Sequence, residues 1–130
     1  MDILIRYGFT IEEIKIMMDT NSLIENINDN NIKSIISILE KVNCNLDDIK
    51  NILICNPFCI TNNINDINNL IDKLKDIGII ELNKLFRTNP YILNISDKEL
   101  DKLYNEKKEV GLNKEEIIDY INYNIIFWGD

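Results

Sequence analysis

The chain has 130 residues, of which 45% are hydrophobic and 28% charged, the balance of an ordinary globular domain. Its 22 acidic and 14 basic residues give a net charge of −8, which repels a phosphate backbone on average. The odd count of three cysteines, none of them in a C-x-x-C pair, predicts a protein of the reducing cytoplasm. No apolar run approaches the roughly 18 residues of a membrane span, so no membrane-spanning helix is expected.

Four segments of the chain align with one another. They begin at Gly8, Asn43, Gly78 and Gly111, so the steps between them are 35, 35 and 33 residues. Glycine and asparagine tolerate the left-handed backbone conformation that closes a helix. The sequence therefore predicts a single helical-repeat domain over 1–130, with units of roughly 8–42, 43–77, 78–110 and 111–130.

Each unit opens with a short helix of about three turns. Capping pairs precede three of these helices, in the form of Thr10 with Glu13, Asn45 with Asp48, and Asn113 with Glu116. The third unit lacks a clear cap. The apolar residues that share one helical face are Ile14, Met17 and Met18, then Ile49, Ile52 and Leu53, then Leu82, Leu85 and Phe86, then Ile117, Tyr120 and Ile121.

An asparagine follows each short helix, at positions 21, 56, 89 and 124. Pro57 and Pro90 come directly after two of these asparagines. The residue before a proline avoids helical geometry, so the short helix is expected to stop at the asparagine. The stretch "ICNPFCI" at 54–60 is then a junction between two helices of one unit.

A longer amphipathic helix completes each of the first three units, over 30–42, 64–77 and 97–110. Their apolar faces comprise Ile32, Ile35, Ile36 and Leu39, then Ile67, Leu70, Ile71 and Leu74, then Leu100, Leu103 and Tyr104. Ser96 with Glu99 forms a capping box for the third. These elements predict an all-α fold, a short α-solenoid of about three and a half stacked helix pairs.

The unit, best seen in "LDDIKNILICNPFCI" and "LNKLFRTNPYILNIS", resembles the repeat of the mitochondrial transcription termination factor (mTERF) family. The resemblance covers nearly the whole chain, and it implies a curved stack of short helices whose basic concave face grips duplex nucleic acid. Nucleic-acid binders of that family carry many repeats and abundant basic residues. This chain differs, because its only arginines are Arg6 and Arg87.

Three carboxylate pairs qualify by residue type for acid–base chemistry: Glu12–Glu13, Asp47–Asp48 and Glu115–Glu116. All three occupy the first turn of a short helix, where the helix dipole and free N–H groups favour anions. We interpret them as structural. With no histidine as a base and no glycine-rich phosphate loop, the sequence predicts neither an enzyme nor a cofactor.

The cysteines Cys44, Cys55 and Cys59 are too few for a zinc site, which needs four ligands. In the repeat they align with positions that hold apolar residues or threonine. We therefore expect all three to pack in the core as small hydrophobic residues, with no metal bound.

The C-terminal "YINYNIIFWGD" is rich in aromatic residues. Tyr120, Tyr123, Phe127 and Trp128 either fold back on the preceding repeat or form a homodimer or partner surface, where tyrosine and tryptophan are favoured anchors.

Two functional hypotheses follow. The first is a non-catalytic acidic protein-binding module, in which an inhibitor or regulator of a nucleic-acid-handling machine occupies a basic groove. Small acidic proteins of this kind, including anti-CRISPR inhibitors, share its size and charge. The alternative is a minimal mTERF-like nucleic-acid binder. It would use one lysine from near-equivalent places on successive short helices, Lys15, Lys50, Lys84 and Lys114.

Overall fold

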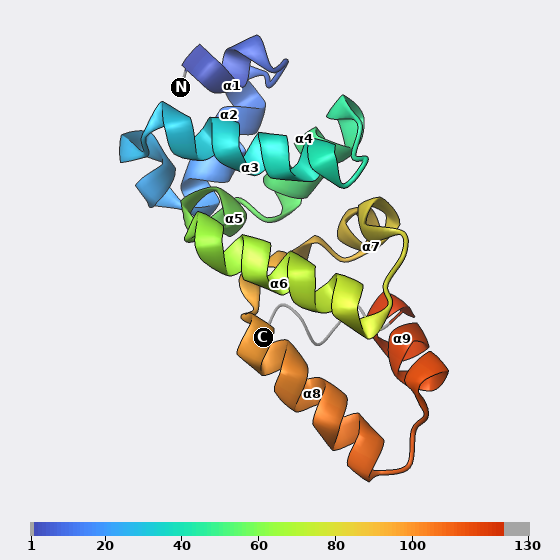
Figure 1. Cartoon of the computed structure of the whole chain (residues 1–130). Helices are drawn as coiled ribbons and strands as arrows, with labels where there is room; N and C mark the ends of the chain where they lie inside the picture. Colours follow the sequence, from blue (N-terminus) through green and yellow to red (C-terminus); the bar gives the residue numbers. More distant parts are fainter. Residues whose placement is uncertain (1, 124–130) are drawn as a thin grey trace. The chain divides into compact units, whose positions relative to one another are not determined.

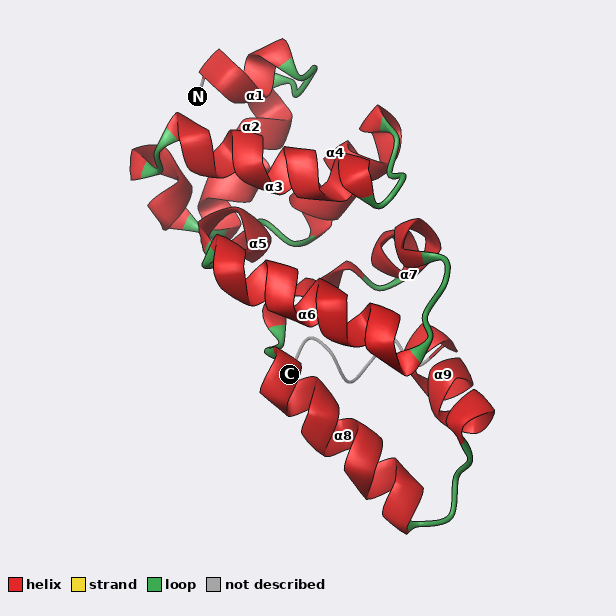
Figure 2. Ribbon diagram, viewed as in Figure 1, coloured by secondary structure: helices red, strands yellow, loops and turns green. Residues whose placement is uncertain are grey.

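The computed structural model describes residues 2–123 of the chain. Every regular element in this range is a helix, and short loops or turns join the helices (Figure 2). The predicted all-α fold is therefore confirmed. The chain divides into two compact units, Met1–Ile64 and Asn65–Asp130. That the whole chain is one domain stays a prediction.

The first unit contains six helices: α1 (Asp2–Arg6), α2 (Ile11–Thr20), the 3-10 helix η1 (Ser22–Asn26), α3 (Asp29–Lys41), α4 (Leu46–Cys55) and α5 (Phe58–Thr61). The two short repeat helices α2 and α4 pack against each other (Figure 1). The longer helix α3 packs against α1 and α5. Equivalent helices of successive repeats thus stack within this unit, as the repeat pattern predicts.

The second unit contains α7 (Leu82–Thr88), the 3-10 helix η2 (Pro90–Asn94), α8 (Asp97–Glu109) and α9 (Lys114–Tyr123), preceded by α6 (Ile64–Ile77), which begins at the boundary. The helices α8 and α9 pack against each other. An ion pair joins α6 to α8, with Lys73 Nζ 2.7 Å from Asp101 Oδ1. The hydrogen bond to Asp101 raises the pKa of Lys73 above its ordinary value.

The four repeat starts adopt the conformation that their residue types predict. Gly8, Asn43, Gly78 and Gly111 have φ values of 92°, 70°, 113° and 102°. At Gly78 space is also short, because an added Cβ would lie 3.2 Å from Ile118 Cδ1. The backbone angle favours glycine there, and a larger residue would also displace the Ile118 side chain of α9 by a few tenths of an ångström.

The predicted caps are present. Thr10, Asn45 and Ser96 each accept a hydrogen bond from the N–H of the acidic residue three positions later, and that acid accepts one in return. Asn113 and Glu116 exchange the same bonds at α9, over 2.8 and 3.0 Å. Glu81 precedes α7 without a side-chain cap, as expected for the third unit.

The predicted apolar faces form the core. Of the residues assigned to them, all are buried except Met18, Leu103, Tyr104 and Tyr120, which are half-buried. The long helices end within one residue of the predicted bounds. Two features were not predicted: the N-terminal helix α1, and the short helical turn that follows each junction asparagine as η1, α5 or η2.

The junction asparagines Asn21, Asn56 and Asn89 are buried and end α2, α4 and α7. The backbone N–H of each donates to the carbonyl four residues earlier, at 2.8 Å in all three cases. The carbonyl of each then accepts a bond from the residue three positions later, which starts the following turn. One asparagine thus closes one helix and opens the next.

The side chain of Asn21 also crosses to the following repeat. Its Nδ2 donates to the Pro57 carbonyl at 3.3 Å and to Thr61 Oγ1 at 2.9 Å, while its Oδ1 accepts from the Leu23 N–H at 3.2 Å. The same residue that ends α2 therefore holds η1 and α5 together.

Candidate binding surfaces

Two of the four candidate lysines lie in the first unit. Lys15 on α2 and Lys50 on α4 each stand six positions before a junction asparagine, so they share one register. Lys15 is exposed. Lys50 is half-buried, with its Nζ 3.5 Å from Glu13 Oε1 and 5.8 Å from the centroid of the Phe9 ring. The cation of Lys50 is therefore already matched by a carboxylate.

Glu13 connects that lysine to the cap of α2. The Thr10 N–H donates to Glu13 Oε1 at 2.8 Å. This backbone hydrogen bond is the main reason that the pKa of Glu13 lies below its ordinary value, and Lys50 lowers the pKa further. The carboxylate thus remains charged at neutral pH beside Lys50.

The other two candidate lysines lie in the second unit and in different registers. Lys84 on α7 is five positions before Asn89, and its Nζ is 4.0 Å from Glu81 Oε2. Lys114 is the first residue of α9, and its Nζ lies 3.7 Å from where a Cβ on Gly78 would stand. The structure therefore places only Lys15 and Lys50 at equivalent helix positions.

A groove of about 390 Å³ lies between α7 and α9 in the second unit. Its lining residues are Gly78, Ile80, Glu81, Lys84, Leu85, Thr88, Ile118, Asn122 and Tyr123. Ile80 is 93% exposed and Tyr123 is 70% exposed, which leaves a large apolar and aromatic area open to solvent. Sequence reasoning missed this groove. Ile80 could have indicated the groove from the sequence. In the other repeats a single apolar residue follows the start and a polar residue comes next, whereas two isoleucines follow Gly78.

The predicted aromatic surface is only partly covered by the described residues. Tyr120 is half-buried, and Lys107 Nζ of α8 stands 4.3 Å above its ring centroid, so this tyrosine packs within the second unit. Tyr123 lines the groove. Phe127 and Trp128 lie outside the described residues.

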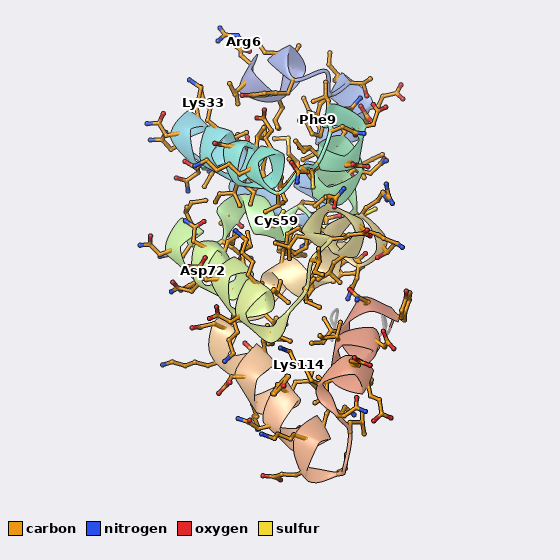
Figure 3. All side chains as sticks on the ribbon, turned by 45° about the vertical axis from the view of Figure 1, so that its right-hand side comes forward. Arg6, Phe9, Lys33, Cys59, Asp72 and Lys114 are labelled. Carbon is orange, nitrogen blue, oxygen red and sulfur yellow. The ribbon has the colours of Figure 1, made fainter. Side chains whose placement is uncertain are left out.

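The expectation for the cysteines is right for two and wrong for the third. Cys44 and Cys59 are buried, whereas Cys55 is exposed at the end of α4 (Figure 3 labels Cys59 in the interior). The positions aligned with Cys55 hold the exposed Thr20 and Thr88, whose hydroxyls donate to a carbonyl four residues earlier. Threonine marks the solvent side of the helix there, and that signal was available in the sequence.

Cys59 donates from Sγ to the Asn56 carbonyl at 3.0 Å, and burial raises the pKa of its thiol to about 12. In the unfolded chain the same thiol ionises near 9.0. Between these two pH values the unfolded chain loses a proton that the folded chain retains, so the Cys59 thiol lowers the free energy of unfolding as pH rises from about 9 to 12.

We therefore expect urea titrations to show a steeper loss of stability above pH 9 in the native chain than in Cys59→Ile, which carries the residue of the aligned Ile24 and Ile92. Equal slopes in the two proteins would contradict the assignment.

At pH 8 a thiol reagent should label Cys55 rapidly and the buried Cys44 and Cys59 only in denaturant.

The second acid of each carboxylate pair caps its helix. Glu13, Asp48 and Glu116 accept from the backbone N–H of Thr10, Asn45 and Asn113 at 2.8, 3.3 and 3.0 Å.

Among the described residues, no group of three or more acidic, cysteine or histidine side chains is arranged to hold a metal ion. No helix in residues 2–123 is long and apolar enough to cross a membrane.

A family model described as mTERF matches residues 17–124. No curated protein matches the chain, and no solved structure matches it.

Proposed function

Because the matched model spans most of the chain, the protein belongs to the mTERF family, and we propose that it is a non-catalytic helical-repeat protein that binds nucleic acid through the phosphate backbone. The observation that carries the proposal is the family match over residues 17–124, since binding of duplex nucleic acid is what this resemblance implies. The candidate contacts are Lys15, Lys50, Lys84 and Lys114. No base-specific contact is part of the proposal.

The charges of the chain limit how strong this binding is. A net charge of −8 opposes approach to a polyanion, and two of the four lysines lie within 4.0 Å of a carboxylate. A phosphate group must replace Glu13 beside Lys50 before that lysine contributes. Exposed and half-exposed ion pairs of this type are worth only about 0–1 kcal/mol, so the exchange is possible at modest cost.

The test is a fluorescence anisotropy titration of labelled duplex DNA and duplex RNA with the full chain at several salt concentrations. We expect binding at low salt, with log K falling against log salt by at most about 4, since each phosphate contact contributes roughly 0.9 to the slope. Lys50→Gln is expected to weaken binding. An absence of binding to both duplexes at low salt would overturn the proposal.

The ion pair between Lys50 and Glu13 gives a sharper comparison. Glu13→Gln keeps a side chain that can still cap α2, yet it removes the carboxylate that competes with phosphate for Lys50. Glu12→Gln makes the same change of net charge at the exposed neighbouring residue. We expect Glu13→Gln to tighten binding more than Glu12→Gln does. Equal effects would mean that only net charge matters and that Lys50 is not a contact.

A second candidate is the acidic protein-binding module, acting as an inhibitor or regulator of a nucleic-acid-handling machine. The net charge of −8 and the groove with Ile80 and Tyr123 favour it. Failure to bind either duplex, together with a partner that is retained by the full chain and lost by an Ile80→Asp, Tyr123→Asp variant, would support this candidate over the first.

A further inference from the structure

The groove between α7 and α9 gathers apolar side chains in one hollow of the second unit. Ile80 and Tyr123 are largely exposed there, and Leu85 and Ile118 line the groove from α7 and α9. Its volume of about 390 Å³ lies within the range of sites that hold a ligand or the anchor side chains of a partner. Apolar groups that are gathered in this way, rather than scattered singly, indicate a binding surface.

The groove suits a helix better than an extended peptide. Its walls are two helices, in which the backbone groups along the length are already bonded within each helix. An extended segment would find no main-chain partners there, and its own buried backbone groups would stay unpaired. A helix bonds its backbone internally. The ten residues of α9 are about 15 Å long, enough to lie beside nearly three turns of a partner helix.

The edge of the groove formed by α9 is acidic. Glu115 and Asp119 are exposed, and each lies three positions before a residue that lines the groove, so they form a row beside Ile118 and Asn122. Neither acid forms an ion pair with another residue in 2–123. Both carboxylates are therefore available to a cation on a bound segment.

The α7 side of the groove has no row of unmatched charge. Lys84 is matched by Glu81, whose Oε2 lies 4.0 Å from its Nζ. Two further cations stand nearby, Lys114 beside Gly78 and Arg87 on α7, and neither of them lines the groove. A bound segment thus meets a row of unmatched charge only along α9, where that charge is negative.

These features select among the possible occupants of the groove. A nucleic acid is disfavoured there, because the lining is largely apolar and the phosphate backbone would face Glu115 and Asp119. A second copy of the chain also carries a net charge of −8, so its approach to this edge is repelled. A basic segment is attracted by the same charges.

We propose that the groove between α7 and α9 binds a basic amphipathic helix of a partner protein. The helix buries apolar residues against Ile80 and Tyr123 and directs lysine or arginine side chains to Glu115 and Asp119. The groove belongs to the second unit, whereas the two lysines in equivalent register lie in the first. The proposal therefore does not rest on the binding of nucleic acid.

The probe is a fluorescently labelled helical peptide of about 16 residues, with leucines along one face and lysines on both flanks. A twin peptide keeps the leucines and has glutamate in place of every lysine. Anisotropy titrations with the full chain are expected to show saturable binding of the lysine peptide, at least about tenfold tighter than that of its twin. No duplex is present, so this result and that of the duplex titration are independent.

Ile80→Asp separates a contact in the groove from general attraction between opposite charges. It adds a negative charge, so general attraction would tighten binding of the lysine peptide, whereas loss of the apolar contact should weaken it by about tenfold or more. Leu23→Asp is the control, since Leu23 is 66% exposed on η1 and does not line the groove. We expect that variant to bind as the native chain does or slightly more tightly.

The acidic edge is tested by removing its charge. Glu115→Gln combined with Asp119→Asn should weaken binding of the lysine peptide, and more so at low salt. Asp66→Asn combined with Asp72→Asn removes the same charge from exposed residues of α6 that do not line the groove. This second pair should have a smaller effect, and equal effects of the two pairs would mean that only net charge matters.

Three further results would overturn the proposal: equal binding of the two peptides, tighter binding of the lysine peptide to Ile80→Asp, or no binding of either peptide. The last is expected if a second copy or the chain's own end already fills the groove, and light scattering over a range of protein concentrations distinguishes these two. Ile80 and Leu23 are both exposed, so both variants should fold, which circular dichroism checks.

Discussion

Replacing Phe86 with alanine is expected to lower the free energy of unfolding by about 3–5 kcal/mol. Phe86 lies on α7, is 0% exposed, and is the largest fully buried side chain among residues 2–123. Its loss removes apolar burial and leaves a cavity that neighbouring helices fill only in part. The total stability of a domain is typically 5–15 kcal/mol, so this one change removes a large share of it.

Urea denaturation followed by circular dichroism measures the effect. Ile80→Ala is the matched control, because Ile80 also lies in the α7 region but is 93% exposed and should change stability by less than about 0.5 kcal/mol. A loss below about 1 kcal/mol for Phe86→Ala would mean that α7 does not form the buried face described above.

Asn21→Ala is expected to cost about 1–3 kcal/mol, the penalty for leaving buried hydrogen-bonding groups unpaired. The substitution removes the bonds of Asn21 to the Pro57 carbonyl, to Thr61 Oγ1 and to the Leu23 N–H at once. The backbone bonds that end α2 remain. The measured loss therefore reports the side-chain link between the first two repeats.

Asn51→Ala is the control for that prediction. Asn51 is an exposed asparagine within α4, where alanine is the better helix former, so stability should stay the same or rise slightly. Similar losses for Asn21→Ala and Asn51→Ala would contradict a special role for the junction residue. The urea slope of Asn21→Ala should match that of the native chain if folding remains cooperative.

Features that depend on local chemistry and on the repeat were predictable. The left-handed starts at Gly8 and Asn43 follow from residue type, and the capping box at Ser96 follows from a three-residue spacing. Periodicity identified the buried faces of the long helices, and the predicted ends of these helices lie within one residue of the observed ends. Each of these signals lies within a few residues of the feature it predicts.

Features that depend on contacts between distant residues were not predictable. The link between Lys50 and Glu13 joins two repeats, and nothing in either segment alone indicates it. The groove between α7 and α9 arises from how two short helices approach each other. Cys55 is a different case, because the threonines aligned with it indicate solvent and its exposure could have been predicted from the sequence.

The side-chain bonds of Asn21 span 36 and 40 residues, about one repeat, and they have a consequence for how the protein forms. Helical chains, in which most contacts are local, typically fold in microseconds to milliseconds, far faster than a ribosome adds a residue. The compact unit Met1–Ile64 contains both partners of these bonds. It is therefore expected to fold during synthesis, while residues 65–130 are still being made, so that assembly proceeds along the chain in the order in which the repeats are translated.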